Sequence, residues 1–189
     1  MNNPGHALNV GPALTLEDLR EGLAFVEMHY QRVFGLSPSP PDHLIIARNT
    51  SRIVGAIGVN VWQPDMGLRL ARLYQFAPTD APLPIDLPHT AEFGRWACDE
   101  EDVSGPLLHA AVCFALSHQK IYAWCEHTTT VNRACRRFGV VFHEVINARI
   151  DPSGIEECHR RFYQYNHTHL YMIELEQARI ALETYLKHS

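Results

Sequence analysis

The stretch that decides the fold is TAEFGRWACDEEDVSGPLLHAAVCFALSHQKIYAWCEH, residues 90–127. Residues 90–99 form an apolar run typical of a strand, and residues 105–118 repeat Leu, Ala and Val at helical spacing. Residues 121–127 are a second apolar strand. A strand–helix–strand unit joins parallel neighbours by a right-handed crossover. We therefore expect two parallel strands in the middle of a sheet.

The segments around this unit predict a mixed sheet of class α/β (α+β). Thr15 and Asp18 resemble a capping box that begins a helix, and the prolines in 35–42 end it. We expect further strands at 43–48, 53–62, 67–76, 140–150 and 167–175. We expect a helix capped by Thr129 or Thr130 and ended by Gly139, and a closing helix over 176–189. Residues 1–14 are predicted to be a flexible arm, and residues 15–189 a single domain.

Composition and charge exclude several classes of function. The chain has 189 residues, 46% of them hydrophobic, and 16 basic against 21 acidic side chains give a net charge of −5. This balance argues against a nucleic-acid partner. The five cysteines are an odd number without Cys-x-x-Cys spacing, which indicates reduced thiols. Because no signal peptide or transmembrane segment is apparent, we expect a cytoplasmic protein.

Glu92 and Arg95 raise the main question about function, because they stand within an apolar strand. They are either structural charges that satisfy their strand neighbours, with Arg95 paired to Asp99 or Glu126, or part of an active site. Side chains three residues apart point to opposite faces of a regular strand, whereas a β-bulge would bring them to one side. A partly buried carboxylate such as Glu92 is a candidate general base, and the Arg95 guanidinium can hold a carboxylate or phosphate bidentately.

Two segments resemble the GNAT-fold N-acyltransferases. NRACRRFGVVFHEV (132–145) resembles their fourth helix and sixth strand, where a helix ends in Gly before an apolar residue. EFGRWACD (92–99) is similar to the Glu-x-x-Arg-aromatic run of acyl-homoserine-lactone (AHL) synthases and N-acyl amino acid synthases. The same elements are similar to those of the thermostable haemolysin group. The resemblance implies a mixed, centrally splayed sheet flanked by helices, and acyl transfer from a thioester to the amine of an amino acid-like small molecule.

The resemblance also implies roles for individual residues. Glu92 becomes the base, the backbone of Phe93, Gly94 and Trp96 binds the acyl thioester, and Cys135 stands where many members carry the tyrosine that protonates the thiolate. A buried structural cysteine is the alternative for Cys135. Ser104 and Gly105 open a helix whose amides can bind a phosphate or the pantetheine arm. Arg72 and Trp124 are candidate substrate-binding residues, and their alternatives are a solvated face and core packing.

The chain departs from the family at the loop that holds the coenzyme A pyrophosphate. The family's glycine-rich loop is replaced by DEEDVSG (99–105), whose carboxylates repel phosphate. The thioester donor is therefore either acyl-CoA or the phosphopantetheine of an acyl-carrier protein, with no permanently bound cofactor. Basic residues at Arg133, Arg136 and Arg137 suit an acidic carrier protein or simply a solvated helix. His167 and His169 have no third metal ligand at a recognisable spacing, so we expect no metal. The alternative functions are a catalytically inactive binding or regulatory module and, more weakly supported, a membrane-active protein.

Overall fold

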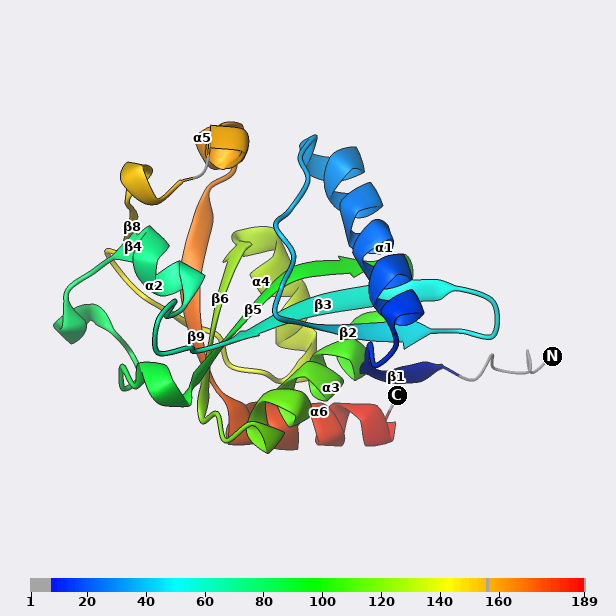
Figure 1. Cartoon of the computed structure of the whole chain (residues 1–189). Coiled ribbons are helices and arrows are strands. Elements are labelled where there is room, and N and C mark those ends of the chain that lie inside the picture. The colour runs from blue at the N-terminus through cyan, green and yellow to red at the C-terminus, as the bar shows by residue number, and fades with distance from the viewer. Residues whose placement is uncertain (1–7, 156, 189) are drawn as a thin grey trace.

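The computed structural model contains a mixed seven-stranded sheet with helices on both faces (Figure 1). It describes residues 8–155 and 157–188, without the side chains of Thr129, Thr130, Ala134, Cys158, Arg161 and Tyr165. In spatial order the strands of the large sheet are β1 (Asn9–Pro12), β2 (His43–Arg48), β3 (Ile53–Val61), β5 (Thr90–Cys98), β6 (Tyr122–Thr128), β9 (Thr168–Glu174) and β7 (His143–Glu144). A separate two-stranded sheet pairs β4 (Tyr74–Gln75) with β8 (Arg149–Ile150).

Six α-helices accompany the sheet in the described residues. They are α1 (Leu16–Phe34), α2 (Arg69–Leu73), α3 (Ser104–Ser117), α4 (Thr129–Cys135), α5 (Arg160–Tyr165) and α6 (Leu175–His188). Short 3₁₀ turns lie at Pro78–Asp80, Leu87–His89, Glu101–Val103, Arg136–Phe138, Pro152–Gly154 and Glu157–His159. The predicted ends of α1 are confirmed, because the Thr15 side chain accepts from the Asp18 N–H and Gly35 adopts the left-handed conformation that closes the helix.

The central crossover is confirmed, and its two strands separate along their length. β5 and β6 are parallel and pair from Thr90–Tyr122 to Phe93–Cys125. Beyond that point β5 pairs only with β3, and β6 pairs only with β9. The edges that face one another across the split therefore carry backbone groups without a strand partner. This is the splayed sheet that the sequence predicts.

A β-bulge lies on β5 where the split begins. Ala56 and Gly58 of β3 face Ala97 and Gly94 of β5, so three steps on β5 match two on β3. The extra residue is accommodated at Arg95, whose φ of 51° is left-handed. A bulge of this kind turns the side chains that follow it relative to a regular strand. Arg95 thereby reaches the face on which Glu92 lies.

The two faces of the sheet are packed in different ways. The continuous face, covered by α3 and α6, has one hydrophobic core that runs from Ile45 on β2 to Ile173 on β9. The divided face has two separate cores, one under α1 around Val26 and one under α2 around Trp124. Figure 1 shows α1 and α2 on the same side of the sheet, opposite α3 and α6. The space between the two cores of the divided face lies over the split.

Three predicted segments differ from the structure. Residues 67–76 form helix α2 and the short strand β4 rather than one long strand, because Leu70 and Leu73, three residues apart, are both buried against the sheet. Residues 140–150 divide into β7 and β8, which belong to different sheets. Residues 9–12 of the predicted arm pair with β2 as the edge strand β1, whereas residues 1–7 lie outside the described part.

Candidate active site

A cavity of about 700 Å³ occupies the split between β5 and β6. Both strand edges line it, with Phe93 to Trp96 on one side and Cys125 to Thr128 on the other. The wall on the continuous face is apolar and consists of Ile57, Phe93, Leu108, Cys125, Cys135, Phe138, Phe142 and Ile173. The wall on the divided face carries charged and polar side chains, namely Ser39, Arg69, Arg95, Glu126, Tyr163 and Thr168. We refer to these two walls as the apolar part and the charged part of the cavity.

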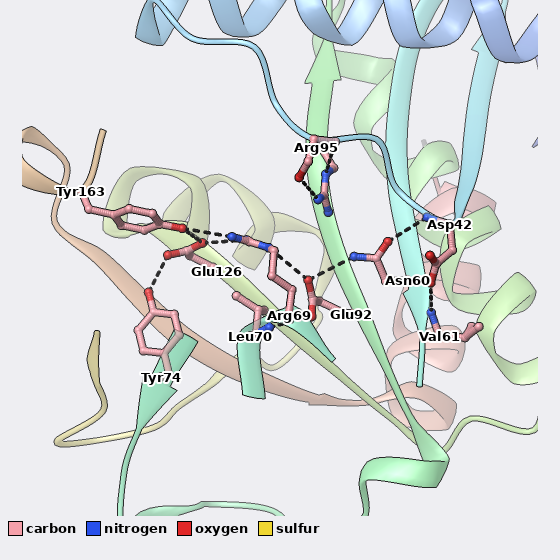
Figure 2. Close-up of polar contacts among 11 residues, drawn as sticks. Asp42, Asn60, Val61, Arg69, Leu70, Tyr74, Glu92, Arg95, Glu126 and Tyr163 are labelled. Atoms are coloured by element: carbon pink, nitrogen blue, oxygen red, sulfur yellow. Dashed lines mark hydrogen bonds and ion pairs between the residues drawn. The ribbon is translucent and has the colours of Figure 1, made fainter. Parts of the chain in front are cut away.

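Glu126, on β6, is the carboxylate of the charged part. Its oxygens accept hydrogen bonds from Tyr74 at 2.7 Å, Tyr163 at 2.9 Å and Thr168 at 3.0 Å. Arg69 adds an ion pair at 3.3 Å (Figure 2). Burial, followed by the charge of Glu126, raises the pKa of Tyr74, so this hydroxyl remains a donor. Three hydroxyls and a guanidinium thus hold the Glu126 side chain in one orientation.

Arg69, on α2, connects the two carboxylates of the network. Its Nε lies 3.6 Å from Glu92, and Figure 2 shows the guanidinium extending from Glu92 to Glu126. Burial alone would lower the pKa of Arg69, but Tyr163, Glu126 and Glu92 outweigh it and raise the pKa. Arg69 is therefore a permanent cation bound to two anions.

Glu92 is fully buried and lies beside the cavity rather than on its wall. One carboxylate oxygen accepts from the Leu70 N–H at 2.9 Å and the other from the Asn60 amide at 3.2 Å. Its expected place facing the cleft is therefore wrong, because α2 and Arg69 cover it. The geometry gives Glu92 the task of anchoring the first turn of α2 and so positioning Arg69. Its role as a base remains a prediction.

Arg95 is a buried cation on the wall of the cavity. Its Nε donates to the Ser39 carbonyl at 2.7 Å, and an Nη donates to the Ser39 hydroxyl at 2.9 Å. None of the ion pairs in the described part of the chain includes Arg95; Asp99 pairs with Arg52 instead. The expected alternative partners, Asp99 and Glu126, are thus not its partners. Burial and the neighbouring Arg69 lower the pKa of Arg95, as expected of a charge that lacks a close anion.

Burial shifts the pKa of two further side chains on the cavity wall, and each is neutral at pH 7. Burial raises the pKa of Tyr30, on α1, to about 12, and the Arg95 guanidinium acts weakly against it. Burial lowers the pKa of His127, on β6, to about 4, so its ring is neutral at pH 7. Because His127 Nδ1 lies 3.2 Å from the Thr128 carbonyl, Nδ1 carries the proton, and Nε2 has no hydrogen-bond partner among the described residues.

Most of the predicted thioester-binding residues line the cavity. Phe93, Gly94, Trp96 and Ser104 all contribute to its wall. Gly105 does not; it is buried beneath α6, and a Cβ there would lie 2.9 Å from the Tyr185 ring. Its expected role in binding is therefore replaced by helix packing.

Cys135 lines the apolar part of the cavity as a buried thiol. Burial raises its pKa to about 12, so it stays protonated at neutral pH. A thiol in this state can be a structural cysteine or a hydrogen-bond donor to a ligand.

The two predicted substrate-binding residues lie away from the cavity. Trp124 is 2% exposed and packs in the core under α2, with its ring centroid 5.7 Å from that of Phe76. Arg72 is exposed on α2 and borders a separate hollow near Ile155. The apolar surroundings of Trp124 and the helical geometry around Arg72 account for the difference.

Ion pairs partly neutralise the acidic run at 99–102. Glu101 pairs with Arg137, which borders the cavity, and Asp99 pairs with Arg52. Arg133 and Arg136 are exposed. His169 pairs with Glu144 at 2.8 Å, and the described residues contain no group of three side chains able to hold a metal. No helix in the described ranges combines the length and apolar character needed to cross a membrane.

The sequence indicated Glu92 and Arg95 but missed Tyr30, His127 and Tyr163. It offered Glu126 only as a possible partner of Arg95, and it left Arg69 open between a substrate contact and a solvated face. Glu126 carried the same signal as Glu92, a carboxylate within an apolar strand. Arg69 and Tyr163 carried no comparable signal, since their place depends on α2 and α5 folding over the split.

Comparison with known proteins rests on structure. No family model and no curated protein matches the chain. Among solved structures, the AHL synthase LasI superposes with a TM-score of 0.64 at 14% identity, covering 94% of both chains. FeeM, an N-acyl amino acid synthase from uncultured soil microbes, gives 0.60 at 10% identity, covering 93% of this chain and 94% of its own. An acetyltransferase of the GNAT family from Staphylococcus aureus gives 0.54 at 11% identity, covering 89% and 99%.

The chain has the GNAT fold. The predicted fold class is thereby confirmed, together with the likeness to the AHL synthase and N-acyl amino acid synthase branches.

Proposed function

We propose that the protein is an N-acyltransferase that moves an acyl group from a thioester to the amine of an amino acid-like small molecule. The observation that carries this proposal is the cavity that crosses the split sheet, apolar on one face and charged on the other. The GNAT fold supports it, because LasI and FeeM are described as acyl transfer enzymes of this kind. Synthesis of an autoinducer or of an N-acyl amino acid is the specific form that we favour.

The two parts of the cavity suit the two substrates. An acyl chain fits the apolar part, where Leu108, Phe138 and Ile173 are buried side chains of the main core. An amino acid-like acceptor fits the charged part, where the Arg95 guanidinium can bind its carboxylate. Among the described residues the Arg95 side chain donates hydrogen bonds only to Ser39 and forms no ion pair, so its guanidinium can take an incoming carboxylate.

The reaction requires a bond from the amine nitrogen to the thioester carbon and loss of the carbon–sulfur bond. The β5 edge after Phe93 has no β6 partner, and an N–H group on this edge can stabilise the oxyanion. The amino acid arrives as an ammonium and first loses one proton to solvent. The neutral amine then gives up a second proton as the amide forms, and the leaving thiolate takes up that proton. Transfer between them, directly or through a water, fits a cavity whose only wall carboxylate among the described residues is held by four donors.

Cys135 and Tyr30 assist the leaving group as hydrogen-bond donors rather than as acids. Each has a pKa near 12, well above that of an ordinary thiol at about 8.5. Proton transfer from either to a thiolate would therefore run uphill, whereas a hydrogen bond to the thiolate is favourable.

The thioester donor is acyl-CoA or an acyl-carrier protein. Arg133 and Arg136 are exposed on and just after α4 and suit an acidic carrier protein, while Arg137 is paired with Glu101. A catalytically inactive binding module is the second candidate. It is favoured by the buried and fully bonded state of Glu92, which leaves the predicted base without access to the cavity.

Thiol release tests the proposal. Purified protein is mixed with acyl-CoA or acyl-carrier-protein thioesters and amino acids, and free thiol and N-acyl products are measured by absorbance and mass spectrometry. We expect thiol release that depends on the amino acid and matches the amount of N-acyl product. Thioester binding without any amide product would support the binding module instead.

A further inference from the structure

Two glycines face each other across β3 and β5, and packing explains why only one of them must be glycine. Gly58 is the register partner of Gly94. A Cβ on Gly58 would lie 2.8 Å from Pro41 and 3.1 Å from the Arg95 side chain, so packing requires glycine there. A Cβ on Gly94 would have no atom within 4 Å, and the Gly94 backbone is not left-handed. Neither packing nor conformation demands the glycine at 94.

Glycine at position 94 makes the folded protein less stable than alanine would. Glycine in a strand loses more conformational entropy on folding than alanine and gives no side-chain packing. Glycine within a strand often marks a place where a ligand approaches the backbone closely. Gly94 also borders the β5 bulge, but the left-handed residue of that bulge is Arg95, so the bulge does not require glycine at 94. Because Gly94 lines the cavity, the close approach of a ligand explains its missing side chain.

The register shows which part of the cavity Gly94 keeps open. Facing residues of an antiparallel pair share one face of the sheet, so a side chain at 94 would point to the same face as one at Gly58. That face carries Pro41 and Arg95, and it is the charged part of the cavity. Gly94 is also the first residue of β5 beyond the last pair with β6, Phe93–Cys125. It therefore forms the floor where the charged part meets the split.

We propose that Gly94 sets the acceptor specificity by leaving room for a substituent on the carbon that bears the reacting nitrogen. This inference rests on the proposed acyl transfer. When the amine attacks a carbonyl held in the split, its nitrogen-bearing carbon is two bonds from the reacting carbon. Any branch on it then lies against β5. An α-amino acid other than glycine is branched at that carbon and needs the space. β-Alanine, the isomer of alanine, carries the same amine and carboxylate without the branch.

Rates with matched acceptors test this role. Wild type, Gly94→Ala and Gly94→Val are assayed with decanoyl-CoA or decanoyl-acyl-carrier protein as donor, and with the L-α-amino acids, alanine included, or β-alanine as acceptor. We expect wild type to favour α-amino acids. The kcat/KM ratio of the best α-amino acid to β-alanine should fall about threefold in Gly94→Ala and at least tenfold in Gly94→Val.

A second strand glycine serves as the control. Gly11 on β1 also has open space around its missing Cβ but lies outside the cavity wall. Gly11→Ala should leave the ratio unchanged. Gly94→Ala and Gly11→Ala should both melt at or above the wild-type temperature, which separates a lost substrate fit from a damaged fold.

Each outcome bears on the inference. Two results would overturn the role of Gly94 while the acyltransferase activity stands. One is a kcat/KM ratio that stays within about twofold of wild type in every variant, and the other is a wild-type preference for β-alanine. If no transfer occurs, calorimetric titration decides. Binding of an α-amino acid that Gly94→Val weakens at least tenfold supports the inference and contradicts the acyltransferase, whereas absence of binding overturns both.

Discussion

The two faces of the sheet divide stability and chemistry between them. The continuous face is a single apolar core under α3 and α6. The divided face leaves a gap between the cores of α1 and α2, and the buried charges Glu92 and Arg95 occupy it. Burying charge costs free energy that an apolar filling would not. We therefore interpret the gap as the place where a ligand would bind, and the opposite face as the main source of stability.

The largest expected effect comes from Arg95→Met, which replaces the unpaired buried cation by an apolar side chain of similar length. We expect kcat/KM for acyl transfer to fall about 1000-fold, or about 4 kcal/mol, because the acceptor carboxylate loses its partner. The free energy of unfolding in urea should change by less than about 1 kcal/mol. A large loss of stability together with retained activity would reverse the comparison between the faces.

Leu107→Ala addresses the continuous face. Leu107 is completely buried on α3 and is not part of the cavity wall. Its truncation should lower the free energy of unfolding by about 3 to 4 kcal/mol, because a cavity remains in the core. The kcat of the folded fraction should stay within about twofold of wild type. Strong loss of kcat at unchanged stability would show that this face takes part in the chemistry.

His127 predicts a pH dependence of stability. Its pKa is about 4 in the folded protein against 6.5 in the unfolded chain, because burial disfavours the charged ring. Between these values the unfolded state binds more protons, so stability is complete above pH 6.5 and falls by up to roughly 3 kcal/mol as the pH drops to 4. His127→Phe should remove this loss in urea unfolding at both pH values. His167 is exposed, so His167→Gln should leave the loss of stability at low pH unchanged. If His127→Phe loses as much stability as wild type between pH 6.5 and 4, His127 is not the group responsible.

Glu92→Gln has the smallest expected effect and decides between two roles. If Glu92 positions α2 and Arg69, the amide still accepts from Leu70, and kcat/KM should fall only about tenfold. A general base at this position would contribute about 100- to 10,000-fold, and its loss would also change the pH profile of kcat. A fall of that size would show that Glu92 acts as a base in the reaction, and it would require a path for protons from its carboxylate to the cavity.

Local sequence patterns predicted the central crossover, whereas the split of the sheet was implied by the resemblance to the GNAT fold. The crossover followed from apolar runs at 90–99 and 121–127, and the bulge at Arg95 was needed to place two charges on one side. The divided face was harder, because apolar residues at Leu68, Leu70 and Leu73 fit a strand and a helix alike. The Glu92 carboxylate on the Leu70 N–H supports the helix, and a contact between positions 22 residues apart has no local signal.

The residues of the site could also be predicted only in part from the sequence. Glu92 and Arg95 were identified because their charges interrupt an apolar strand. The fixed orientation of Glu126 requires hydroxyls from Tyr74, Tyr163 and Thr168, which come from three separate segments. Only tertiary structure brings such donors together, so the sequence alone could not show which carboxylate reaches the cavity.

A crystal structure with 2-oxoundecyl-CoA tests the central claim most directly. In this ketone analogue of decanoyl-CoA a methylene separates the sulfur from the carbonyl, so it keeps the carbonyl but cannot transfer its acyl group. We predict that the acyl chain lies in the apolar part of the cavity and that the carbonyl lies within hydrogen-bond distance of the β5 backbone between Gly94 and Trp96. An analogue bound elsewhere, with the split between β5 and β6 still empty, would contradict the account.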